Sequence, residues 1–145
     1  MTGTVFVDTN VLIYVREEHH PLKQQKAISW MRHLWDSDNG RISFQVLQEY
    51  FNKIVQKKTG FAEQARADVR DLLAWNPVTV NALLLERAWK IQDRYHLSFW
   101  DSLIVAAAKA ASCRWLLTED LQPGQNLDGI IVVNPFLCTP DELSS

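Results

Sequence analysis

The sequence is poor in features that define several common protein classes. Its 145 residues include only 2 cysteines. These residues, Cys113 and Cys138, make neither a disulfide framework nor a paired metal-ligand spacing, which favours a reducing cytoplasm. No repeat, low-complexity tract or linker divides the chain, and a hydrophobic content of 47% is sufficient for a core. We therefore expect a single domain over residues 1–145.

Long apolar runs are also absent. The most apolar segment, residues 103–111, is interrupted by Lys109 and is too short to span a bilayer. The N-terminus has no basic region followed by an apolar stretch, as a signal peptide would have. These features predict a cytoplasmic protein without membrane attachment.

An excess of positive charge is missing too. The 15 Lys and Arg residues are outnumbered by 17 Asp and Glu residues, which gives a formal net charge of -2. This balance is unfavourable for nucleic-acid binding, because affinity for phosphates normally comes from an excess of cations.

The chain does contain an alternation of short extended runs and longer helical ones. This pattern predicts an α/β domain with a central, mainly parallel sheet of about five strands flanked by helices. Short apolar runs predict strands at residues 4–7, 41–43, 77–80, 114–117 and 129–133. Apolar residues at helical spacing predict helices at residues 11–16, 21–35, 44–58, 61–73, 84–95 and 98–111.

The segment "VFVDTNVLIY" places Asp8 at the carboxyl end of the first predicted strand. Ligands of open parallel sheets bind outside the carboxyl ends of the strands, so a carboxylate at this point would face a cleft. A structural alternative is that Asp8 or Thr9 caps the helix that follows. The segment alone does not decide between these two roles.

Three other carboxylates occupy comparable junctions between strands and helices. Glu49 precedes Lys53 by four residues, which also suits a helical ion pair. Asp101 follows Ser98 in "SFWD", which resembles a capping box with Asp in place of Glu. Asp120 follows a predicted strand, where Asp commonly serves turns and caps. Each acid therefore has a structural explanation as well as a functional one.

Taken together, the four acids indicate a metal site. Carboxylates gathered in a partly desolvated cleft repel one another and cost stability unless cations neutralise them. Carboxylate and water ligands suit Mg²⁺ or Mn²⁺, and the chain has no H-E-x-x-H or paired-cysteine spacing for zinc. We interpret the four histidines as surface or local structural residues: His19, His20, His33 and His96.

The segments "VFVDTNVLIY", "SFQVLQEYFN", "SFWDSLIVAAA" and "WLLTEDL" together resemble the PIN-domain ribonucleases, particularly the VapC-type toxins of bacterial toxin–antitoxin pairs. The resemblance covers nearly the whole chain, with the motifs in the family's order. It implies catalytic, metal-binding roles for Asp8, Glu49, Asp101 and Asp120, with supporting polar roles for Thr9, Asn10 and Thr118. Glu119 adjoins Asp120 and is an alternative fourth ligand.

The same resemblance implies Mg²⁺- or Mn²⁺-dependent hydrolysis of RNA phosphodiester bonds. It further implies a homodimer and a cognate antitoxin whose segment crosses the groove and blocks the acidic site. The 6 tryptophans would lie mostly in the core, with some extending to an oligomer or partner surface.

The proposed ligand set changes the meaning of the charge balance. Removing 4 ligand carboxylates from the 17 acids leaves 13 against 15 cations, so the rest of the chain is formally +2. Several basic residues are candidate phosphate contacts, although each also suits a solvated helix face: Arg16, Lys53, Lys57, Lys58, Arg87, Lys90 and Arg94.

Two other function classes stay open at this point. A phosphatase with Asp8 as nucleophile would follow the haloacid-dehalogenase pattern, which expects a second Asp two residues later, where this chain has Asn10. A non-catalytic PIN-like module would bind RNA or protein without cleavage, but such modules usually lack some of the acids. Metal-dependent RNA cleavage that is lost in Asp8→Asn would distinguish the three.

Overall fold

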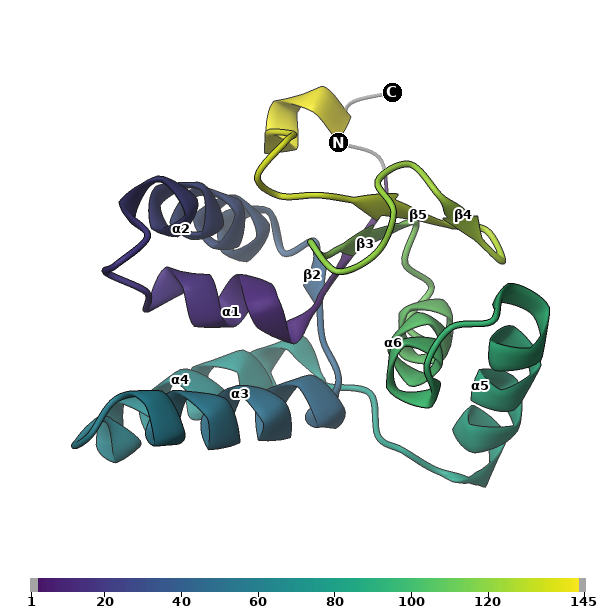
Figure 1. Ribbon diagram of the computed structural model, residues 1–145, viewed down its shortest axis with the longest axis horizontal. Coiled ribbons are helices and arrows are strands. Elements are labelled where there is room, and N and C mark those ends of the chain that lie inside the picture. The colour runs from purple at the N-terminus through teal and green to yellow at the C-terminus, as the bar shows by residue number, and fades with distance from the viewer. Residues whose placement is uncertain (1–2, 144–145) are drawn as a thin grey trace.

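A five-stranded sheet forms the centre of the molecule (Figure 1). The structure, a computed structural model, describes residues 3–143. The strands are arranged in the order β2-β1-β3-β5-β4. Strands β1, β2, β3 and β5 are parallel, and β4 joins one edge as an antiparallel strand. The bounds are β1 Val5–Val7, β2 Gly40–Arg41, β3 Trp115–Leu117, β4 Asn126–Leu127 and β5 Ile130–Val133.

Helices cover the sheet in pairs. Figure 1 shows α1 beside α2 on one flank, α3 beside α4 below them, and α5 with α6 on the other flank, and these three pairs are in contact. The helices are α1 Thr9–Val15, α2 Pro21–Ser37, α3 Phe44–Lys57, α4 Ala62–Leu72, α5 Ala82–Tyr95 and α6 Phe99–Ala110, with short 3-10 turns at Leu73–Trp75 and Pro140–Leu143. Among residues 3–143, no helix has both the length and the apolar character needed to cross a membrane.

The burial of the central strands explains their continuous apolar sequences. All three residues of β1 are buried, as parallel strands are when helices cover both faces of a sheet. In α6 the run from Ser102 to Ala108 is also buried. The predicted α/β class with a mainly parallel sheet of five strands is confirmed.

One predicted strand is wrong. Residues 77–80 form only an isolated bridge, in which Val78 pairs with the segment around Ser43. Pro77 has no N–H to donate to a ladder, and Val80 is 46% exposed, although Val78 packs against the core. The segment therefore passes the sheet without joining it.

Strand β4 takes the fifth place in the sheet, and the hydrophobic pattern of the sequence does not predict it. It contains two residues, too few to display an alternation. It is held in place by a tight turn to β5 in which Asp128 and Gly129 have φ values of 58° and 97°. Positive φ at both residues is the geometry of the two-residue turns that join antiparallel strands.

Candidate functional site at the carboxyl edge of the sheet

Two neighbouring strands place the first polar side chains of the site. Strands β1 and β3 pair in parallel with Val7 opposite Leu117, so Asp8 and Thr118 both follow the last residues of this pair. The Asp8 N–H donates to the Leu117 carbonyl at 3.1 Å. The two side chains consequently lie at the same edge of the sheet, and the Thr118 hydroxyl donates to Asp8 Oδ2 at 2.9 Å.

Asp8 combines the capping role and the site position that the sequence left as alternatives. It is the N-cap of α1, and its Oδ1 accepts the Thr9 N–H at 2.7 Å. Its Oδ2 faces Thr118 instead. The residue is only 7% exposed, so these bonds hold the carboxylate in one orientation. The cap therefore positions the acid and does not compete with its place in the site.

Asn10 links the two acids that end the strands. Its Nδ2 lies 3.0 Å from Thr118 Oγ1 and 3.1 Å from Asp120 Oδ2. The same nitrogen is 3.4 Å from Asp8 Oδ2. An amide can bridge two carboxylates in this way because it donates two hydrogens without adding charge.

Glu49 reaches the site from α3. Its Oε2 accepts the Thr9 hydroxyl at 3.2 Å, and its Oε1 accepts the Gln45 amide at 2.9 Å. Within residues 3–143, Glu49 forms no ion pair with Lys53. Gln45 is a site residue that the motifs do not predict, although its spacing of four residues from Glu49 is a recognisable helical signal.

Asp101 enters from the first turn of α6. The Ser98 hydroxyl caps this helix by accepting the Asp101 backbone N–H at 3.1 Å. The half-buried Asp101 carboxylate also interacts with the Ser98 side chain. Burial raises the pKa of Asp101, the Ser98 side chain acts to lower it, and the negative charges of Asp120 and Glu49 raise it further.

The negative charges of Asp120 and Glu49 act on both Asp8 and Asp101. Burial raises the pKa of Asp8 to about 6, with further increases from Asp120 and Glu49, against the lowering effect of hydrogen bonds from Thr118 and Thr9. In the described part of the chain, no basic side chain forms an ion pair with any of the four. The adjacent Glu119 differs, because Lys23 pairs with it at 2.9 Å.

The chemistry of these donors fits a hard divalent cation. Four carboxylates and two hydroxyls supply oxygen atoms, the donor type that Mg²⁺ and Mn²⁺ prefer. As the side chains stand, residues 3–143 contain no group of three or more His, Cys, Asp or Glu gathered closely enough to hold an ion.

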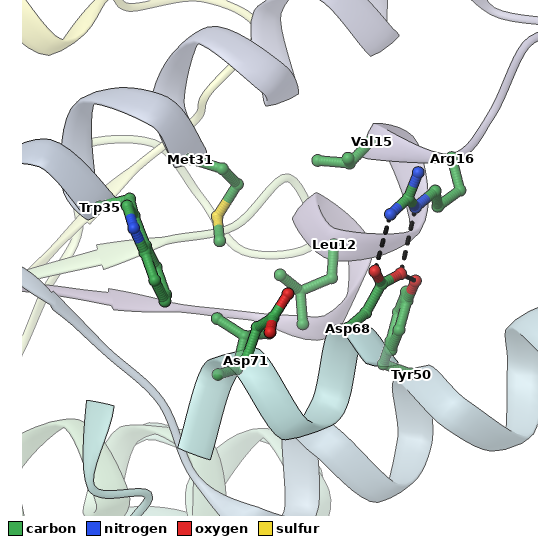
Figure 2. A pocket seen from close by; sticks show the side chains of 9 residues that line it. Leu12, Val15, Arg16, Met31, Trp35, Tyr50, Asp68 and Asp71 are labelled. Carbon is green, nitrogen blue, oxygen red and sulfur yellow. Dashed lines mark hydrogen bonds and ion pairs between the residues drawn. The ribbon is translucent and has the colours of Figure 1, made fainter. Parts of the chain in front are cut away.

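Three of the basic residues considered as phosphate contacts pair with acids of the protein: Arg16, Lys57 and Arg94. Arg16 forms two hydrogen bonds with Asp68, which lies between it and Tyr50 at one side of a cavity of about 190 Å³ (Figure 2). Lys57 pairs with the buried Glu17 at 2.5 Å. By contrast, Lys53 has no ion-pair partner among residues 3–143.

Comparison with known proteins gives one family and a shared fold. The family model described as PIN domain matches residues 5–124. A toxin-antitoxin complex from Klebsiella pneumoniae contains a similar chain, with a TM-score of 0.66 and 20% identity over 91% of this chain and 98% of that one. The crystal structure of VapBC2 from Rickettsia felis bound to a DNA fragment from their promoter contains another similar chain. Its TM-score is 0.60 and its identity 18%, over 90% of this chain and 98% of that one. A search of curated proteins found no match.

Proposed function

We propose that this chain, which belongs to the PIN domain family, is a ribonuclease that uses Mg²⁺ or Mn²⁺ to hydrolyse RNA phosphodiester bonds. The observation that supports the proposal is that Thr9 and Asn10 link Asp8, Glu49 and Asp120 by hydrogen bonds. No basic side chain among residues 3–143 pairs with these acids or with Asp101. Acids without a cationic partner repel one another and lower the stability of the fold. A bound cation therefore explains their presence better than a structural role does.

The four carboxylates are the residues that would hold the ion. Thr9, Asn10 and Thr118 support them by donating hydrogen bonds to Glu49, Asp120 and Asp8. When bound, the ion would supply Lewis-acid stabilisation of the phosphodiester and make water a better nucleophile. Glu119 is a weaker candidate ligand than Asp120, because Lys23 already neutralises it.

Hydrogen bonds within the chain hold the acids in fixed positions. Asp8 is fixed by Thr9 on one oxygen and by Thr118 on the other, so it does not need to reorganise when substrate enters. Asn10 holds Asp120 at a set separation from Asp8 through its single amide nitrogen. Asp101 forms no ion pair with a basic side chain of residues 3–143, which leaves its charge available to a cation.

The biological role we propose is that of the toxin in a toxin–antitoxin pair. The support is fold similarity to chains in a toxin-antitoxin complex and in VapBC2, over 91% and 90% of this chain. Such a role implies a cognate antitoxin, a homodimer and a cytoplasmic location. Exposed tryptophans offer apolar surface for such partners, since Trp35, Trp89 and Trp100 are 48%, 47% and 61% exposed.

Asparagine substitution of the acids tests the nuclease assignment. Purified Asp8→Asn and Asp101→Asn should each cleave RNA in Mn²⁺ at least about 100-fold more slowly than the wild type, because a neutral amide is a poor ligand for a hard cation. Asp36→Asn is a matched control, since Asp36 is an exposed acid on α2 outside the site. Activity near that of the wild type in either acid variant, folded and saturated with metal, would reject the assigned site.

A further inference from the structure

A second charged feature lies on the flank formed by α5 and α6. It is a pocket of about 460 Å³, lined by Arg87, Lys90, Arg94, Lys109 and Asp128 above a floor of Ile91 and Ala106. We call it the basic pocket. None of the acids at the carboxyl edge of the sheet lines it.

Helix geometry and one carboxylate bring these cations together. Arg87, Lys90 and Arg94 follow one another at intervals of three and four residues, so they share one face of α5. Asp128, in the turn between β4 and β5, contacts Arg94 at 3.4 Å and Lys109 at 2.5 Å. These two pairs connect α5 and α6 across the pocket, and the cations hold the pKa of Asp128 below its usual value.

The pocket has more positive charge than its single acid can balance. Four cations against one carboxylate leave a formal charge of +3. Arg87 and Lys90 have no ion-pair partner within residues 3–143, and the acids Glu86 and Asp93 of the same helix are not part of the lining. Because the whole chain is -2, everything outside this pocket sums to -5. Positive charge is thus concentrated here in an otherwise acidic protein.

The pocket is separate from the acidic site but close enough for one polymer to reach both. Lys109 and Asp101 lie on the same helix, α6, eight residues apart. At the helical rise per residue their backbone positions are about 12 Å apart along the axis. A dinucleotide at the acids would not occupy the basic pocket, whereas a longer strand can extend from one to the other.

We propose that the basic pocket binds the phosphodiester backbone of the RNA substrate at nucleotides away from the cleaved bond. The inference rests on the proposed nuclease function and adds a second contact for the same substrate. Arginine forks and lysine ammonium groups suit phosphate oxygens. The lining has no aromatic anchor of the kind that dominates protein interfaces, which disfavours an acidic protein segment as the occupant.

Binding of poly(U), measured by fluorescence anisotropy in chelator so that no cleavage occurs, tests the proposal. Arg87→Gln/Lys90→Gln should bind roughly tenfold more weakly at low salt than the wild type. Its slope of log affinity against log salt should be shallower by about 1.4, because two phosphate contacts to a single strand are lost. Arg32→Gln/Arg70→Gln is the matched control, since it removes the same charge from exposed residues of α2 and α4.

Selective loss of affinity and slope in the Arg87/Lys90 variant would support the basic pocket. No binding of poly(U) by the wild type, or equal effects of the two double substitutions, would overturn it. Displacement of poly(U) by polyglutamate more readily than by poly(dT), at equal ionic strength and equal charge, would also overturn it in favour of a protein ligand. The assay does not depend on cleavage. If the Arg87/Lys90 variant binds poly(U) as the control does while the wild type hydrolyses RNA, only the pocket proposal is rejected. If binding depends on the pocket but the wild type does not hydrolyse RNA, only the nuclease proposal is rejected.

Discussion

Each end of α1 lies beside a carboxylate with its surrounding polar side chains, and we call these two groups the clusters at the ends of α1. They differ in the partners of the carboxylate. At the N-terminal end, Asp8 lies among other acids, and no cation of residues 3–143 pairs with it. At the C-terminal end, Asp68 receives two hydrogen bonds from Arg16 at 3.1 and 2.7 Å and one from Tyr50 (Figure 2). Gln64 donates a further one. Both carboxylates are largely withdrawn from water, so the difference between them lies in their partners.

The pKa values of the two acids record this difference. Burial raises the pKa of Asp8, and neighbouring acids raise it further. Burial acts in the same direction on Asp68, but hydrogen bonds from Arg16, Tyr50 and Gln64 outweigh it and lower the pKa. A carboxylate whose charge is balanced by a cation and hydrogen bonds of the same chain has a structural role. One whose charge is unmatched points to a ligand from outside the chain.

The largest expected effect is stabilisation of the acidic end by metal. An ion that binds the folded acids and not the unfolded chain stabilises by about 2.7 kcal/mol at 100 times its dissociation constant. For a domain of this size, the melting midpoint should rise by roughly 5 to 15 °C with Mn²⁺ relative to chelator. Asp68→Asn, at the other end of α1, should keep this rise, whereas Asp8→Asn should lose most of it. A full rise in Asp8→Asn would break the comparison.

The pH dependence of stability should have opposite signs at the two ends. Between pH 3.8 and about 6, folded Asp8 retains a proton that the unfolded chain has released. The free energy of unfolding in chelator should therefore fall by a few kcal/mol as the pH rises through this window, because one pKa unit corresponds to about 1.4 kcal/mol. Asp101, whose pKa is also raised, acts in the same direction.

Asp68 has the reverse dependence. Its folded pKa is lowered, so its contribution is present above the unfolded value of 3.8 and is lost as the pH falls through the folded value. Urea unfolding at a series of pH values checks both signs. Asp8→Asn should flatten the decline between pH 3.8 and about 6, and Asp68→Asn should flatten the loss in stronger acid. Identical profiles for the two variants would remove the distinction between the clusters.

Much of this arrangement is predictable from local sequence, and the remainder depends on contacts between distant segments. The apolar runs of β1, β3 and β5 and the periodic helices follow from burial. Two of the four acids follow predicted strands and two lie in the first half of predicted helices, which makes them recognisable in the sequence. Residues 77–80 resemble a strand in composition but form only one bridge, between Val78 and Ser43, because Pro77 cannot donate to a ladder. The two residues of β4 are positioned by their turn and carry no pattern of their own.

The pairing of charges is the least predictable part of the site. Asn10 contacts Thr118 and Asp120 across separations of 108 and 110 residues, which no local spacing encodes. Likewise, Glu119 and Asp120 are adjacent acids, yet only Glu119 lies within reach of Lys23. Which acids stay uncompensated is decided by how α1, α2 and the β3 edge meet, and this follows from packing of the whole domain.

Removal of one carboxylate from each cluster should separate stability from activity. Asp68→Ala leaves Arg16 and Tyr50 without their acceptor and should lower the free energy of unfolding by about 1.5 kcal/mol, a moderate value because Arg16 is partly exposed. Asp120→Ala, at an exposed position, should change it by less than about 0.5 kcal/mol in chelator. RNA cleavage should show the reverse order. Urea unfolding and cleavage rates measured on the same preparations would contradict this if one variant lost both properties.

The smallest expected effect separates the cap of α6 from the acid beside it. Ser98→Ala removes the hydroxyl that accepts the Asp101 N–H and should cost about 1 kcal/mol of stability. Asp101→Asn retains that backbone bond and relieves repulsion from Asp120 and Glu49, so in chelator its stability should equal or exceed that of the wild type. Mn²⁺ should reverse the ranking, because Ser98→Ala keeps all four acids and the full rise in melting midpoint, whereas Asp101→Asn gains less. Thermal melts of both variants with Mn²⁺ and with chelator measure the two effects together. An equal Mn²⁺ shift in both would mean that Asp101 serves only the helix, and the acidic end of α1 would then lack one of its four proposed ligands.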